Sequence, residues 1–229
     1  MDFSRSNTST AQAIIAEELE KFHAIEHLHD HWARATDKPA YYWYITFKDC
    51  IALHAMVEQC RNRLALPYYD FTSPEDLHMT LDRIGPKNDI MSDTLSSVEA
   101  IARDAVKRIT SFDITIGALG GTPGAIGFRA FPDESISYLR NALRMATIQA
   151  YPRADVKSSP FHPHVTIAYC NRDVPAARAI SAIDRLRIFS YVNFTVSNVV
   201  LVLLERTERS YYWREIATIP LSRAATERP

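Results

Sequence analysis

A short pattern that occurs twice constrains the fold of this chain more than any other feature of its sequence. Leu77–Leu81 reads LHMTL and Pro163–Ile167 reads PHVTI, so each segment holds His-x-Thr followed by an aliphatic residue. Strand geometry places the His and the Thr of each motif on one face and the aliphatic residues on the other. A similar order of strand and helix precedes each motif, as it would if one lobe had been duplicated.

Hydrophobic periodicity and turn residues predict helices and strands that are interspersed along the chain. The predicted helices cover residues 10–35, 51–65, 93–109, 134–148 and 176–186, and the predicted strands cover 41–47, 76–84, 112–116, 126–131, 164–169, 192–196, 199–205 and 211–221. Several strands follow one another directly, which is typical of hairpins. We therefore expect an α+β fold with mainly antiparallel sheets.

Glycines are concentrated in one short stretch. Five of the six in the chain lie between residues 117 and 127. This crowding predicts a hairpin there, with positive φ angles at some of its residues.

The first residues differ in character from the rest. We assign residues 1–38 to a tail and an amphipathic helix, because apolar residues recur every three or four positions as far as Trp32. We assign residues 39–229 to the main domain, which begins with an aromatic strand. The apolar side of this helix is expected to pack on the domain or to form a homodimer. His23, His27 and His31 recur at a spacing that zinc accepts, but polar residues opposite an apolar stripe usually face solvent, so we expect no metal site.

Composition excludes several classes of protein. The chain has 26 Lys and Arg against 27 Asp and Glu, a net charge of −1, so it lacks the broad basic field of a nonspecific nucleic-acid binder. Cys50, Cys60 and Cys170 have no CxxC spacing, which speaks against a disulfide framework or a thiolate zinc site. The longest aliphatic run, Val199–Leu204, is far shorter than the roughly 20 residues of a membrane span. We expect a cytoplasmic protein with no membrane partner.

The two motifs, their separation, the aromatic strand and the glycine-rich hairpin resemble the 2H phosphoesterase superfamily, which includes 2′-5′ RNA ligase-like proteins and cyclic phosphodiesterases. The resemblance covers roughly residues 39–221. It implies two similar lobes around a central cleft, with helices on the outer faces and one motif from each lobe. It also implies opening or formation of a phosphodiester that involves a ribose 2′-oxygen, without a metal or other cofactor.

The resemblance also suggests which residues carry the reaction. The catalytic candidates are His78, Thr80, His164 and Thr166. In this family the residue five positions beyond each motif histidine often helps to hold the substrate, which here points to Arg83 and Tyr169. Strict alternation would turn that position to the opposite face, so each strand must bend or end before it.

The first aromatic strand should also contribute to substrate binding. One face of the strand that carries Tyr42 and Tyr44 should approach the cleft, and we include Tyr44 among the substrate-binding candidates.

Elementary chemistry agrees with the catalytic assignment. Two histidines can serve as the base and the acid on opposite sides of a phosphorus atom, and two threonine hydroxyls can donate to its nonbridging oxygens. The expected partner is a nucleotide or RNA end that carries a 2′,3′-cyclic phosphate or a 2′-5′ linkage. Two alternatives stay open: a protein that binds such ends without turnover, and a hydrolase of another cyclic nucleotide or oligonucleotide.

Overall fold

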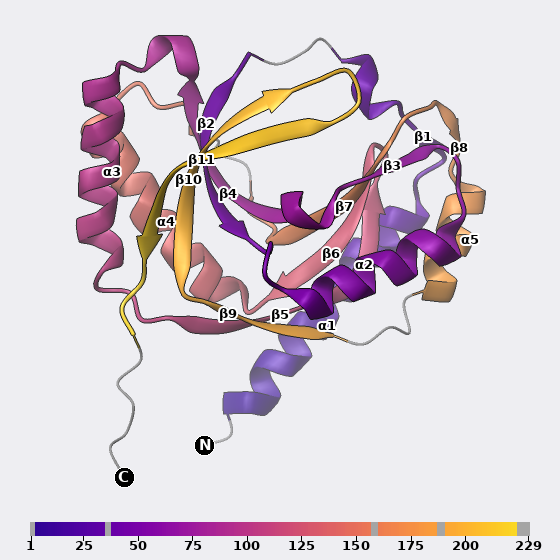
Figure 1. Cartoon of the computed structure of the whole chain (residues 1–229). Coiled ribbons are helices and arrows are strands. Elements are labelled where there is room, and N and C mark those ends of the chain that lie inside the picture. The colour runs from indigo at the N-terminus through magenta and orange to yellow at the C-terminus, as the bar shows by residue number, and fades with distance from the viewer. Residues whose placement is uncertain (1–2, 35–37, 157–159, 187–190, 224–229) are drawn as a thin grey trace.

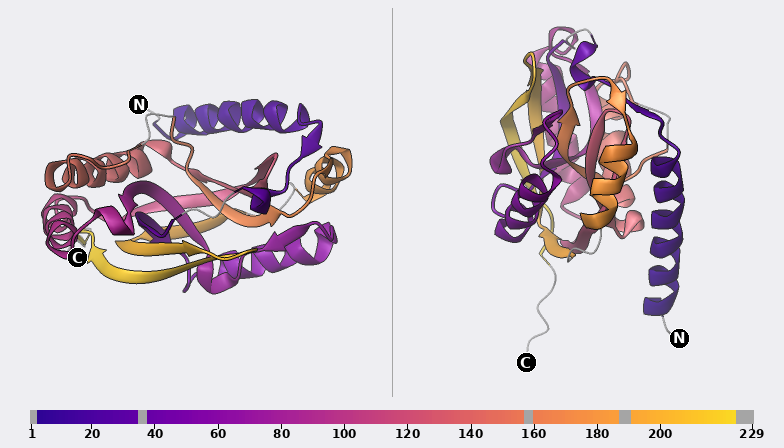
Figure 2. Two further views of the ribbon diagram at one scale, coloured as in Figure 1. Left: turned by 90° about the horizontal axis from the view of Figure 1, so that it is seen from above. Right: turned by 90° about the vertical axis from the view of Figure 1, so that its right-hand side faces the viewer.

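Two antiparallel sheets form the body of the molecule in the computed structural model, which describes residues 3–34, 38–156, 160–186 and 191–223 (Figure 1). Helices flank the pair of sheets on both sides, and α1 runs along the outside of the body (Figure 2). The observed class is α+β with mainly antiparallel sheets around a cleft, as predicted. None of the helices in the described residues is long and apolar enough to span a membrane.

The four-stranded sheet carries the first motif at its edge. Its order is β11 (Tyr211–Pro220), β10 (Asn198–Arg206), β2 (Ala40–Thr46) and β4 (His78–Pro86). Helices α3 (Ser92–Val106) and α4 (Asp133–Ala150) pack together, and they contact β11 and β4 respectively. Trp43 of β2 is fully buried, and its indole N–H donates to Thr147 Oγ1 of α4 at 2.9 Å.

The five-stranded sheet carries the second motif. Its order is β3 (Tyr69–Phe71), β7 (His164–Cys170), β6 (Ala125–Phe131), β5 (Phe112–Thr122) and β9 (Val192–Val196). Helices α2 (Ile51–Leu64) and α5 (Ala177–Leu186) contact each other, and α5 also contacts β5. Strands β4 and β7 contact each other across the two sheets, so the two motif strands meet.

The N-terminal segment departs from the predicted long helix. Helix α1 (Phe3–His23) ends at His23, and the chain continues as the short strand β1 (His27–Leu28) and the 3₁₀ helix η1 (His31–Ala33). Strand β1 pairs with β8 (Val174–Pro175), and this pairing buries Leu28 completely, so tertiary contacts override the local helical periodicity. The predicted His23, His27 and His31 stripe therefore does not exist.

The apolar side of α1 packs within the molecule. Phe22 is buried, and Leu19 packs against the same core. Two further 3₁₀ helices, η2 (Pro74–Asp76) and η3 (Lys87–Asp89), lie before and after β4. The three cysteines are buried and free.

The predicted glycine-rich hairpin is formed by β5 and β6, but positive φ does not explain its glycines. The residue with positive φ in this hairpin is Ala118. A Cβ at Gly117 would lie 2.0 Å from the Tyr191 ring, and one at Gly127 would lie 2.5 Å from the Val165 carbonyl oxygen. Glycine is therefore required at these two positions because neighbouring atoms lie too close to the backbone to leave room for a Cβ.

Candidate active site

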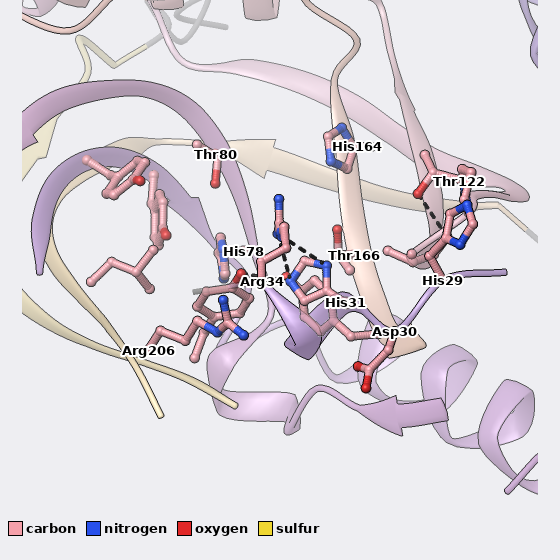
Figure 3. A pocket seen from close by; sticks show the side chains of 18 of the residues that line it. His29, Asp30, His31, Arg34, His78, Thr80, Thr122, His164, Thr166 and Arg206 are labelled. Carbon is pink, nitrogen blue, oxygen red and sulfur yellow. Dashed lines mark hydrogen bonds between the residues drawn. The ribbon is translucent and has the colours of Figure 1, made fainter. Parts of the chain in front are cut away.

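The two His-x-Thr motifs meet in one cavity. This cavity has a volume of about 620 Å³, and His78 and Thr80 of β4 line it together with His164 and Thr166 of β7. Figure 3 shows these four side chains around the same space. Tyr44 and Tyr169, two of the three predicted substrate-binding residues, also line it.

Both motif imidazoles are held in the same way. His78 Nδ1 lies 2.7 Å from the carbonyl oxygen of Asp76, and His164 Nδ1 lies 2.7 Å from the carbonyl oxygen of His162. A carbonyl oxygen only accepts, so Nδ1 carries a proton in each ring. In the neutral ring, Nε2 then keeps its lone pair and is the atom able to take up a proton.

The two histidines differ in their environment. Burial lowers the pKa of His78 to about 4, the Asp76 carbonyl opposes this effect, and the nearby His164 adds to it. The Tyr44 ring stacks on the His78 imidazole with centroids 4.0 Å apart and planes at 10°. His164 is exposed. The His78 imidazole is consequently neutral at neutral pH and suits the role of a base.

A tyrosine accompanies each motif threonine. Tyr44 lies opposite Thr80 in the β2–β4 ladder, Tyr169 follows Thr166 on β7, and both tyrosines line the cavity with the two threonines. Burial is the main cause that raises the pKa of both phenols above the ordinary value. Both phenols therefore stay protonated at neutral pH and can orient the threonine hydroxyls.

A β-bulge follows each motif threonine. The β2–β4 register shifts so that Leu81 has no partner, and the β6–β7 register shifts so that Ile167 has none. The carbonyl oxygens of these two bulged residues accept from Arg140 Nε and from the Thr72 backbone N–H, each at 2.9 Å. Each strand therefore bends, and the residue five positions beyond the histidine returns to the face of the motif.

The bulges have different outcomes for the two predicted residues at that position. Tyr169 lies opposite Ala125 and lines the cavity. Arg83 lies opposite Tyr42 but does not line the cavity, and its guanidinium forms an ion pair with Asp155. The structure therefore does not bring Arg83 to the site, because the chain after α4 supplies a carboxylate that holds it.

Sequence reasoning missed one wall of the cavity. That wall comes from the segment after α1 and from strands β10 and β11, and it includes His29, Asp30, His31, Arg34, Lys38, Arg206 and Tyr211. The sequence hints at this wall only through the net charge of +3 over residues 172–229. The helix predicted over residues 10–35 gave no indication that His29, Asp30, His31 and Arg34 line the cavity.

A second, smaller cavity adjoins the first. Its volume is about 430 Å³, and it lies between α1 and the β5–β6 hairpin. His164 and Thr166 line both cavities. Within the described residues, no group of three or more His, Cys, Asp or Glu side chains is arranged to hold a metal ion.

Solved structures with the same architecture define the class of fold. E. coli LigT in complex with 3′-AMP matches with a TM-score of 0.61 and 14% identity, over 81% of this chain and 99% of LigT. TT0787 of Thermus thermophilus matches with a TM-score of 0.60 and 18% identity, over 80% of this chain and 97% of that protein. The PDE domain of MHV ns2 matches with a TM-score of 0.50 and 12% identity, over 72% and 99%. The fold is therefore LigT-like.

Sequence comparison then identifies the family. A model of the 2′-5′ RNA ligase superfamily matches residues 47–208. The chain belongs to this superfamily, the 2H phosphoesterases, as its paired motifs predicted. Comparison with curated proteins finds no sequence match.

Proposed function

We propose that the protein is a metal-independent phosphodiesterase that opens a nucleotide or RNA-terminal 2′,3′-cyclic phosphate or a 2′-5′ phosphodiester. The observation that supports this most strongly is the meeting of His78 and His164 in one cavity, each with Nδ1 bound to a backbone carbonyl. Two imidazoles fixed in the same tautomer on two different strands suit proton transfer on both sides of a phosphorus atom.

His78 is the general base in this mechanism. Its Nε2 removes a proton from the attacking water, because burial keeps the ring neutral at neutral pH. The water oxygen forms a bond to phosphorus as the bond from phosphorus to the leaving ribose oxygen breaks. The leaving oxygen receives its proton from Nε2 of His164, which acts as the general acid.

Thr80 and Thr166 stabilise the charge on the phosphoryl group. Each threonine lines the cavity together with a tyrosine that stays protonated and can donate a hydrogen bond that orients its hydroxyl. Donors that are already oriented stabilise the negative charge on the nonbridging oxygens without reorganisation during the reaction. Tyr44 and Tyr169 therefore act as positioning residues that also line the substrate cavity.

The test is a turnover assay with EDTA-treated protein. The substrates are 2′,3′-cyclic mononucleotides and short RNAs that end in a 2′,3′-cyclic phosphate or contain a 2′-5′ linkage, and phosphorus NMR identifies the products. We expect the wild type to hydrolyse at least one of them, and His78→Asn and His164→Asn each to lower kcat by about 10²-fold or more. His27→Asn is the matched control, since His27 is exposed and lies outside the cavity lining.

Two results would contradict the proposal. Undiminished turnover in both motif variants would exclude the two-histidine mechanism. Binding without any turnover, seen as phosphorus shifts of unchanged ligand, would favour a protein that recognises these ends only.

A further inference from the structure

The segment that precedes the family-matched region forms part of the cavity wall. The family model begins at residue 47, whereas the cavity lining includes residues 29–31, 34 and 38. Figure 3 shows His31 and Arg34 in front of His78 and Thr166, with Arg206 at the same opening. This part of the chain therefore adds charged and imidazole side chains to the cavity that the two motifs do not supply.

Specific contacts hold this segment in place. The indole N–H of Trp32 donates to Asp70 Oδ2 at 2.9 Å, and Arg206 donates to the Trp32 carbonyl at 2.6 Å. His31 Nε2 and the Tyr211 hydroxyl lie 2.7 Å apart, and the His31 ring packs on Tyr169 with centroids 4.4 Å apart. The segment is thus anchored on both sheets, and its aromatic neighbours Tyr169 and Tyr211 line the same cavity.

The charge of this wall is positive although the whole chain carries −1. Arg34, Lys38 and Arg206 line the cavity, against the single carboxylate of Asp30. That carboxylate already caps η1, because it accepts from the Trp32 backbone N–H at 2.8 Å. Among the residues that the structure describes, no carboxylate forms an ion pair with Arg34, whose guanidinium lies 3.3 Å from His31 Nε2.

We infer that Arg34 and Lys38, together with Arg206, form a subsite for a second phosphate of the substrate. This inference rests on the proposed function, since the two motifs account for the phosphate that reacts. Arg and Lys bind phosphate oxygens through charge-assisted hydrogen bonds, and adjacent aromatic rings suit a nucleobase or ribose. The preferred substrate therefore carries a phosphate in addition to the reacting one, either as a 5′-phosphate or as the neighbouring internucleotide phosphate.

Equilibrium binding tests the subsite without relying on turnover. Isothermal titration calorimetry compares adenosine 3′-monophosphate with adenosine 3′,5′-bisphosphate, for the wild type and for an Arg34→Gln/Lys38→Gln variant. We expect the wild type to bind the bisphosphate about 10-fold more tightly or better, and the variant to lose most of this preference. Lys107→Gln is the control, because Lys107 is an exposed cation at the end of α3 that lies outside the cavity lining.

The outcomes separate the two hypotheses. Equal affinity for both nucleotides in the wild type, or an unchanged preference in the variant, would overturn the subsite. A preference that depends on Arg34 and Lys38 without any turnover of cyclic phosphates would support the subsite and contradict the proposed function.

A second binding comparison identifies the source of the additional phosphate. The dinucleotide ApAp, which carries an internucleotide phosphate and a 3′-phosphate but a free 5′-hydroxyl, is titrated alongside adenosine 3′,5′-bisphosphate. A gain for ApAp that the double variant loses assigns the subsite to an RNA backbone, and a gain limited to the bisphosphate assigns it to a terminal 5′-phosphate. The thermal midpoints of all variants must agree with that of the wild type, since both replaced side chains are exposed.

Discussion

Replacing His78 by asparagine should remove a pH-dependent part of the free energy of unfolding. Burial lowers the pKa of His78 to about 4 in the folded protein, whereas the value in an unfolded chain is about 6.5. Between these values the unfolded state binds more protons than the folded state, so stability falls as the pH falls through this window. The loss amounts to about 2 kcal/mol between pH 7 and pH 5, and to about 3 kcal/mol by pH 4.

Urea unfolding of the wild type and of His78→Asn at pH 7, 6 and 5 measures this quantity, with tryptophan fluorescence as the signal. We expect the wild type to lose about 2 kcal/mol more of its unfolding free energy than the variant does between pH 7 and pH 5. Thr166→Val, which changes the same cavity without removing an ionisable side chain, should follow the pH dependence of the wild type. A difference that stays constant over this range would refute the argument that burial keeps His78 neutral.

Three further predictions concern the site and the strands that support it. Thr166→Val should lower kcat on the order of 10²-fold in steady-state kinetics, with little change in the thermal unfolding midpoint. An unaltered kcat would show that the Thr166 hydroxyl does not stabilise charge in the transition state. Asp82→Asn should lower the free energy of unfolding in urea by roughly 3–5 kcal/mol, because the buried Asp82 carboxylate pairs with Arg144 at 2.6 Å. A loss below about 1 kcal/mol would show that this ion pair contributes little. Gly127→Ala should destabilise by about 1–3 kcal/mol, whereas Gly120→Ala, whose Cβ would meet nothing within 4 Å, is the control that should not.

Most of the main domain follows from local sequence patterns. Helices such as α4 and α5 carry clear amphipathic periodicity, and strand β9 is observed over the predicted residues 192–196. The long N-terminal helix was wrong beyond His23, because the spacing of Leu28 and Trp32 imitates helical periodicity. In the structure each of these residues packs against a separate distant partner, which no local pattern reveals.

The candidate site was only partly accessible from the sequence. His78 and His164 stood out because the same pattern surrounds both. The assignment of Arg83 to the site did not allow for its ion pair with Asp155, a contact between residues far apart in the sequence. Arg34 lies within the predicted helix and Lys38 just after it, and neither gave a signal, since isolated cations there resemble any solvated surface.

The anchoring of the N-terminal segment also has a consequence for the order of folding. His23 contacts Asp184, 161 positions later, and His31 contacts Tyr211, 180 positions later. Contacts of such large sequence separation close very long loops, and they form late because the entropy of closure is lost before the contacts stabilise the chain. Residues 23–32 are synthesised well before these partners. The contact of His31 with Tyr211 requires β11, so we expect this part of the cavity wall to be completed late in folding.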